Sequence, residues 1–125
     1  DLFNPAAVVD VNHSNSGKKF KEQIRLVKEV MHNRQVSSDI EHMVKGVMIE
    51  SYIEEGNQKI GDHIYGKSIT DPCLGWEDSR DLISTIADMA ANARSEKESR
   101  LRDSPRASGS QSDIFLTASC ASSRS

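Results

Sequence analysis

Three short runs along the chain have the composition of buried β-strands. Residues 6–11 are apolar apart from Asp10 and follow Pro5, as expected for a strand of a parallel sheet. A second apolar run covers residues 44–49, and a third, much shorter run covers residues 68–70 and is stopped by Pro72. The pattern therefore predicts three strands, separated by connections long enough to hold helices.

Two stretches place apolar residues at helical spacing with charged residues between them. The first begins at residue 18, after the turn-forming residues 14–17, and its apolar positions are Phe20, Ile24, Val27, Val30 and Met31. The second follows the acidic and capping residues 75–79, and its apolar positions are Leu82, Ile83, Ile86, Met89, Ala90 and Ala93. Residues 33–41 and 54–66 lack such a period, so we expect loops there.

The order strand–helix–strand–loop–strand–helix predicts an α/β protein with a parallel sheet. Three strands and two helices cannot close a barrel of eight strands, so any barrel would be incomplete. The helical pattern fades after about residue 95, and a Ser-rich segment follows. We expect one folded unit over residues 1–98 and a disordered tail over residues 99–125, because its one apolar patch, residues 114–116, is too isolated to build a core.

Composition narrows the function classes. The chain has 125 residues and a formal net charge of −3, which argues against a general nucleic-acid binder. No apolar run approaches the roughly 20 residues that span a bilayer, and no signal-peptide pattern opens the chain, so we expect no membrane partner. Cys73 and Cys120 are too few for a disulfide framework and fit a cytoplasmic location. The start at Asp1, almost directly on a strand, suggests a piece of something longer.

Candidate chemistry lies at the C-terminal ends of the three predicted strands, where His13, Glu50 and Asp71 stand. In parallel α/β folds this edge of the sheet houses the functional site. Each residue also has an ordinary explanation, since His13 could cap a turn and Asp71 before Pro72 could form an Asx-turn. A carboxylate that ends a buried strand, as Glu50 does, is costly unless it is paired. One imidazole and two carboxylates together suit divalent Mn, Fe, Co or Zn.

Two further features could bind an anion. Residues 14–19 combine serines, a glycine and two lysines before a predicted helix, where backbone N–H groups attract phosphate, although ordinary capping explains the serines equally well. Lys67 could face an anionic substrate or simply solvate a loop.

One motif is misleading. Residues 61–68 fit the G-x-x-x-x-G-K-[ST] phosphate-loop pattern in every position. That loop requires a strand before it and a helix beginning at its Lys-Ser pair. Here β-branched residues and Pro72 follow, and residues 54–59 before it are polar. We therefore reject nucleotide binding.

Four blocks of sequence carry a resemblance to a known family. They are residues 10–18, which read DVNHSNSGK, residues 46–51, GVMIES, residues 55–58, EGNQ, and residues 65–78, YGKSITDPCLGWED. In this order and spacing they resemble the C-terminal part of class I 3-deoxy-D-arabino-heptulosonate 7-phosphate (DAHP) synthase. The resemblance covers roughly residues 5–95 and leaves the tail out.

The resemblance implies a TIM (β/α)₈ barrel of which this chain supplies the last three βα units. It implies a transferase of aromatic amino acid biosynthesis that condenses phosphoenolpyruvate with erythrose 4-phosphate, the first step of the shikimate pathway. The family holds a divalent metal ion with a Cys, a His, a Glu and an Asp, and the last three map onto His13, Glu50 and Asp71. His13 and Lys67 are then the expected catalytic residues, and the parent enzyme is expected to be a homo-oligomer.

The chain lacks several residues that form the functional site in this family. The metal-binding Cys and most of the Arg and Lys residues that clamp the substrate phosphates belong to family segments outside this sequence, and Cys73 is not the equivalent Cys. We therefore expect the 125-residue chain to be inactive alone. The competing hypothesis is a truncated, catalytically inactive product with at most a binding role.

Overall fold

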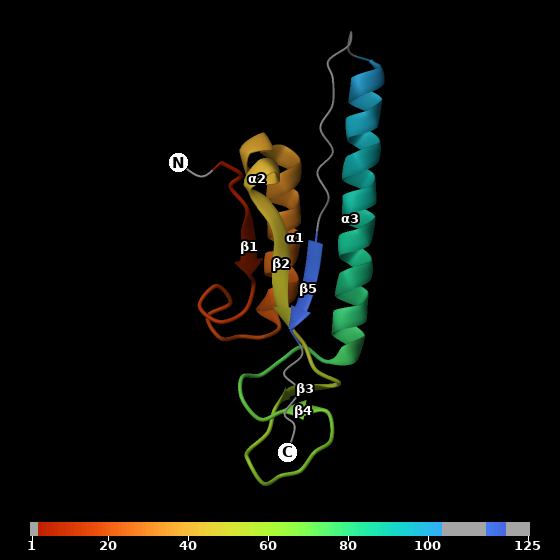
Figure 1. The fold of residues 1–125 in the computed structure, drawn as a ribbon. Coiled ribbons are helices and arrows are strands. Elements are labelled where there is room, and N and C mark those ends of the chain that lie inside the picture. Colours follow the sequence, from red (N-terminus) through yellow and green to blue (C-terminus); the bar gives the residue numbers. More distant parts are fainter. Residues whose placement is uncertain (1–2, 104–114, 120–125) are drawn as a thin grey trace.

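The computed structural model describes residues 3–103 and 115–119 of the chain. The described elements are β1 (Ala7–Asp10), α1 (Glu22–Val36), α2 (Ser38–Met43), β2 (Val44–Glu50), β3 (Glu54–Asn57), β4 (Lys67–Ser68), α3 (Trp76–Arg102) and β5 (Phe115–Ser119). They form an α/β arrangement without a closed barrel among the described residues (Figure 1).

The larger sheet has the strand order β1-β2-β5, and all its strands are parallel. Val8 pairs with Gly46 and Asp10 with Met48, and the Val11 N–H extends the ladder by donating to the Met48 carbonyl at 3.1 Å. The first two predicted strands are thereby confirmed as parallel neighbours. Their C-terminal ends lie at the same edge of the sheet.

The hydrophobic core lies between this sheet and the two long helices. Its buried members come from α1, α3, β2 and the segments that follow β1 and β4, and they are Val11, Val27, Met31, Val47, Ile49, Leu74, Leu82 and Ile86. Figure 1 shows α1 packed against the sheet, and α1 also contacts both β2 and α3. Both helices predicted from the apolar spacing thus exist and supply the core.

The third predicted strand is not in the main sheet. Only Lys67–Ser68 is extended, and it pairs with β3 in a separate two-stranded sheet. The Gln58 side chain holds this sheet together by donating to the Ile64 and Lys67 carbonyls at 2.8 and 2.7 Å. The edge of β2 that faces away from β1 is occupied by β5 instead.

The boundaries of the first helix differ from the prediction. Residues before Glu22 form turns, because Gly17 and Lys18 adopt left-handed backbone angles with φ of 60° and 61°. A second short helix, α2, lies in the segment predicted to be a loop. The Ser37 hydroxyl caps it by accepting the Ile40 N–H at 3.4 Å, a local signal that does not depend on apolar spacing.

Two parts of the tail that was expected to be disordered have regular secondary structure. Helix α3 continues to Arg102, so the boundary expected at residue 98 falls inside it. Lys97 Nζ anchors this end by pairing with Glu41 Oε1 at 3.0 Å. Residues 115–119 form β5, whose register places Thr117 beside Met48. The rest of the expected tail, residues 104–114 and 120–125, lies outside the described residues.

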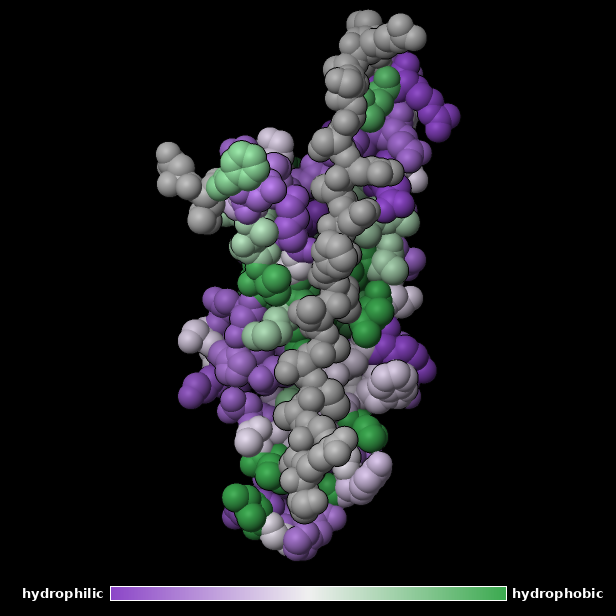
Figure 2. Space-filling model, viewed as in Figure 1, coloured by the Kyte–Doolittle hydropathy of each residue, from purple (hydrophilic) through white to green (hydrophobic). Residues whose placement is uncertain are grey.

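The surface is mixed in polarity. In Figure 2 apolar side chains stand out at the end of the molecule that holds β3 and β4. The exposed apolar residues of this loop region include Ile60, Ile64 and Ile69. Among the described residues, none of the helices combines the length and apolar character that crossing a membrane requires.

Candidate metal centre

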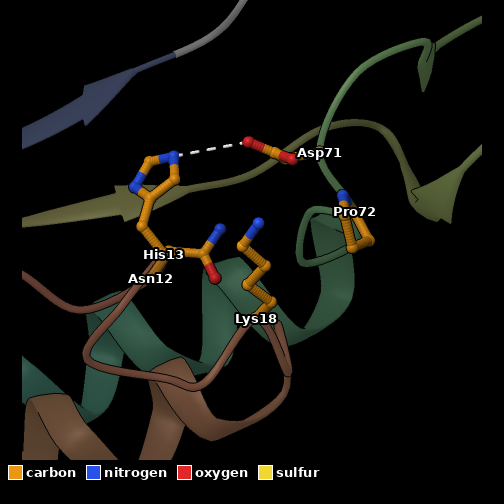
Figure 3. Close-up of a pocket in the computed structure, with 5 residues that line it drawn as sticks. All are labelled: Asn12, His13, Lys18, Asp71 and Pro72. Carbon is orange, nitrogen blue, oxygen red and sulfur yellow. Dashed lines mark ion pairs between the residues drawn. The ribbon is translucent and has the colours of Figure 1, made fainter.

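Three separate segments bring His13, Glu50 and Asp71 together. Glu50 is the last residue of β2, His13 follows β1 after a short extension, and Asp71 follows β4. The His13 Nε2 atom lies 3.2 Å from Glu50 Oε1 and 3.5 Å from Asp71 Oδ2. Figure 3 shows the imidazole of His13 directed at the Asp71 carboxylate. Asp71 thus lies at the site although the strand before it, β4, belongs to the separate two-stranded sheet.

The chemistry of these donors fits a divalent ion. One ligand atom from each of the three residues lies within 4.8 Å of the other two. Bonds of about 2.0–2.2 Å to nitrogen and oxygen imply ligand–ligand separations of about 3–3.5 Å, close to the two distances from His13 Nε2. The Asp71 side chain is the most exposed of the three, at 59% against 21% for Glu50. The open side of the centre is therefore the side of Asp71.

His13 is held from behind by Asp10. The Asp10 Oδ2 atom lies 2.7 Å from His13 Nδ1, which leaves Nε2 to face Glu50 and Asp71. This hydrogen bond is the largest cause that raises the pKa of His13, and the charges of Glu50, Asp10 and Asp71 raise it further, against a small opposing effect of desolvation. Without an ion, the imidazole therefore keeps its proton to a higher pH than an isolated histidine.

Glu50 is held by Asn12. The Asn12 Nδ2 amide donates to Glu50 Oε2 at 2.6 Å, so each oxygen of this carboxylate has a different neighbour. Asn12 and Asp10 are parts of the site that are not predicted from the sequence. A charged residue inside an apolar strand was the available signal for Asp10, whereas nothing in the sequence alone pairs Asn12 with a residue 38 positions away.

A small pocket opens beside the centre. Its lining residues are Asn12, His13, Lys18, Asp71 and Pro72. Lys18 stands next to Asn12 in Figure 3, and its left-handed backbone costs a non-glycine residue roughly 1–2 kcal/mol. Within the described part of the chain, the Lys18 ammonium group has no ion pair. Of the two candidate anion-binding features, residues 14–19 therefore reach the pocket through Lys18.

Lys67, the other predicted catalytic residue, is not among the residues that line this pocket. It lies in β4, half-buried, and its Cε atom is 4.0 Å from the position that a Cβ atom on Gly56 would take. Its role in catalysis stays a prediction. Cys73, in contrast, is buried, and its thiol donates to the Asp71 carbonyl at 3.3 Å, which helps to fix the segment that carries Asp71.

The rejected phosphate-loop motif has the wrong structure for nucleotide binding. Gly61, His63 and Gly66 all have positive φ angles, and the Lys67–Ser68 pair forms a strand rather than the start of a helix. The helix start that a phosphate loop requires at this pair is therefore missing.

Comparisons with known proteins agree with the resemblance. Residues 2–84 match the model of the DAHP synthetase I family. The chain is 42% identical over 88 residues to the Trp-sensitive phospho-2-dehydro-3-deoxyheptonate aldolase of Enterobacter agglomerans, a match that covers 68% of this chain and 24% of that protein. It is 44% identical over 94 residues to the Phe-sensitive enzyme of Escherichia coli K12, covering 72% of this chain and 26% of that one.

A solved structure gives the same result. The phospho-2-dehydro-3-deoxyheptonate aldolase of Francisella tularensis SCHU S4 superposes with a TM-score of 0.58 at 32% sequence identity, covering 66% of this chain and 24% of that chain. The chain thus spans about a quarter of the length of the relatives that it matches.

Proposed function

The chain belongs to the DAHP synthetase I family, and we propose that it is the C-terminal part of a metal-dependent DAHP synthase. The whole enzyme would condense phosphoenolpyruvate with erythrose 4-phosphate to give DAHP and phosphate in the cytoplasm. In this proposal the chain supplies the last three βα units of a (β/α)₈ barrel, and Ser68–Thr70 takes its place in the main sheet only when the rest of the barrel is present.

The observation that carries the proposal is the convergence of His13, Glu50 and Asp71. Their ligand atoms come from positions up to 58 residues apart (71 − 13) and lie within 4.8 Å of one another. They are also the residues that the family resemblance assigns to the metal. Mn, Fe, Co or Zn in the divalent state would suit one imidazole and two carboxylates.

When bound, the ion would supply Lewis-acid polarisation of the aldehyde of erythrose 4-phosphate. The roles proposed for the protein are to hold and orient the reactants. His13 would present Nε2 to the ion, while its Nδ1 group contacts Asp10 and fixes the orientation of the ring. The Lys18 ammonium, which lines the pocket, and Lys67 would attract the anionic substrates. C3 of phosphoenolpyruvate would bond to the aldehyde carbon, and water would add at C2 and give a proton to the aldehyde oxygen. The C2–O bond to the phosphate group would then break, so that phosphate leaves and C2 becomes the ketone carbon of DAHP.

We further propose that the 125-residue chain has no activity alone. The fourth metal ligand and most phosphate-binding residues of the family lie in segments that this sequence does not include. Homo-oligomerisation of the whole enzyme is part of the same proposal, as is the absence of nucleic-acid and membrane partners.

A chimera tests the function. Residues 2–84 of this chain would replace the matching segment of the Escherichia coli Phe-sensitive relative, and DAHP formation would be assayed with added Mn²⁺. We expect activity from the chimera and none from the isolated chain. His13→Ala or Glu50→Ala in the chimera should lower activity by more than the roughly 100-fold that loss of an outer partner of a metal ligand costs.

The matched control is His32→Ala, which removes an exposed histidine of α1 and should leave activity unchanged. A folded chimera without activity, or one indifferent to His13→Ala, would contradict the proposed function. Turnover by the isolated chain would contradict its proposed inactivity.

A further inference from the structure

A closed ring of polar contacts includes two of the three candidate ligands, His13 and Glu50. Asp10 Oδ2 contacts His13 Nδ1 at 2.7 Å, and His13 Nε2 lies 3.2 Å from Glu50 Oε1. Glu50 Oε2 accepts the Asn12 amide at 2.6 Å. The ring closes because the Asn12 backbone N–H donates to Asp10 Oδ1 at 2.9 Å. In both His13 and Glu50, one polar atom of the side chain contacts a neighbouring residue and the other faces the centre.

We propose that Asp10 and Asn12 are positioning residues, which aim His13 Nε2 and Glu50 Oε1 at the ion without touching it. This inference rests on the proposed function, because it assumes that the three-residue centre holds a metal. Neither residue belongs to the ligand set that the family resemblance implies.

The orientation of the Asn12 amide is fixed by its own partner. Ser16 Oγ donates to Asn12 Oδ1 at 3.0 Å, so the amide oxygen is occupied and the Nδ2 group must point to the carboxylate. Asn12 is 3% exposed and Ser16 is 6% exposed. A buried amide that lost this arrangement would leave polar groups unsatisfied at about 1–3 kcal/mol each. The Glu50 Oε2 atom is thus kept from the ion by a donor that cannot easily rotate away.

Asp10 is fixed just as firmly. Its two carboxylate oxygens accept from Asn12 N–H and face His13 Nδ1, and its carbonyl accepts the Asn15 amide at 2.6 Å. A carboxylate can only accept hydrogen bonds. Asp10 Oδ2 lies 2.7 Å from Nδ1, whereas Glu50 Oε1 and Asp71 Oδ2 lie 3.2 and 3.5 Å from Nε2. The shorter contact therefore favours the imidazole form that carries a proton on Nδ1. That form leaves the Nε2 lone pair free for a metal. Carboxylates behind ligating histidines act in this way in metal sites generally.

Two substitutions separate these effects in the full chain. Asp10→Asn keeps the shape of the side chain but adds an N–H donor that can bind Nδ1 and place the proton on Nε2. Asn12→Ala removes the donor to Glu50 Oε2. Each should weaken Mn²⁺ binding by about 10–100-fold, measured from the electron paramagnetic resonance signal of free Mn²⁺. The matched controls are Asp88→Asn and Asn92→Ala, which make the same changes at exposed positions of α3 and should bind Mn²⁺ as the unchanged chain does.

A second measurement needs no metal. Nitrogen-15 NMR of the His13 ring, at a pH where the imidazole is neutral, should show the proton on Nδ1 in the unchanged chain and in both controls. Asp10→Asn should shift the proton toward Nε2, whereas Asn12→Ala should not. A purely structural role for Asp10 would leave the proton where it is.

The outcomes divide the two proposals. If the unchanged chain binds Mn²⁺ and both variants bind it equally well, the positioning role is overturned while the proposed metal site stands. If the unchanged chain does not bind Mn²⁺, the metal site fails, and a His13 proton on Nε2 in that chain would overturn the role of Asp10 as well. If circular dichroism shows that Asn12→Ala does not fold, Ser16→Ala replaces it, because this variant removes the donor that fixes the Asn12 amide. If Ser16→Ala then binds Mn²⁺ as well as the Asn92→Ala control does, the role of Asn12 is overturned.

Discussion

The side chain of Gln23 takes the place of a strand partner for Glu50. Its Nε2 group donates to the Glu50 carbonyl at 3.1 Å, and its Oε1 atom accepts the Glu50 N–H at 2.8 Å. Gln23 is 0% exposed although it lies in α1. Since β1 ends at Asp10, the last residue of β2 has no ladder partner on that side. The Gln23 side chain binds both backbone groups of Glu50, and the Leu74 N–H also donates to the Glu50 carbonyl, at 3.0 Å. By holding the backbone of Glu50, Gln23 also fixes the position from which the Glu50 side chain extends to the candidate centre.

Replacing Gln23 should therefore destabilise the chain. In Gln23→Leu the Glu50 N–H loses its partner, whereas the Glu50 carbonyl keeps the Leu74 N–H. One unsatisfied donor costs about 1–3 kcal/mol, so we expect a loss of about 1–3 kcal/mol in the free energy of unfolding in urea. Gln35→Leu on the same helix is the control, because Gln35 is exposed and makes a single hydrogen bond, to the Met89 carbonyl at 3.2 Å. Equal losses in the two variants would show that Gln23 does not act as a strand partner.

The parts of the site that the sequence predicts depend on local patterns. Residues 6–11 and 44–49 are apolar runs long enough to form strands, and parallel pairing then places His13 and Glu50 at one edge. Helix spacing predicts α1 and α3 for the same reason. The strands β1 and β2, the helices α1 and α3, and the approximate location of the candidate centre follow from these short-range patterns.

The parts that the sequence does not predict depend on contacts between distant residues. Gln23 and Glu50 are 27 positions apart, and a polar residue on an otherwise amphipathic helix gives no sign of such a partner. The choice between residues 68–70 and residues 115–119 for the edge of β2 is a competition between segments. A pattern within either segment cannot decide that competition.

Gly66 is required for two reasons. Its φ angle is 72°, and a Cβ atom added there would lie 2.8 Å from Ile53 Cβ. We expect Gly66→Ala to lower the free energy of unfolding by about 1–2 kcal/mol for the left-handed backbone and by about 1–3 kcal/mol more for overpacking. Gly17→Ala is the control, since Gly17 has a φ of 60° but nothing within 4 Å. Urea unfolding that finds the two variants equally destabilised would contradict the steric contribution.

His13 should make the stability of the metal-free chain depend on pH. Its pKa is raised in the folded chain, first by the hydrogen bond with Asp10 and then by the charges of Glu50, Asp10 and Asp71. A raised folded pKa means that this stabilisation is fully present below the unfolded pKa of about 6.5 and is lost as the pH rises through the folded value. With a chelator present, the stability difference between the unchanged chain and His13→Gln should therefore shrink as the pH rises.

The test is a set of urea titrations across this pH range, together with NMR titration of the His13 ring. Glu50→Gln removes the second largest cause of the shift and should move the His13 pKa downward. A stability difference that grows with rising pH would reverse the sign and contradict this account of His13.

Strand β5 should protect one set of β2 amides. The Met48 carbonyl accepts from Val11 in β1, and in a parallel strand alternate residues direct their backbone groups to opposite edges. Val47 and Ile49 therefore face β5, with which they pair at Leu116 and Ala118. A chain that ends after Asp103 should show faster hydrogen exchange at Val47 and Ile49 and a much smaller change at Met48. A chain that ends after Ser119 keeps β5 and is the control. Backbone N–H groups that are released to water lose the protection that ladder hydrogen bonds provide. Unchanged exchange at Val47 and Ile49 in the shorter chain would therefore mean that β5 does not pair with this edge of β2 in solution.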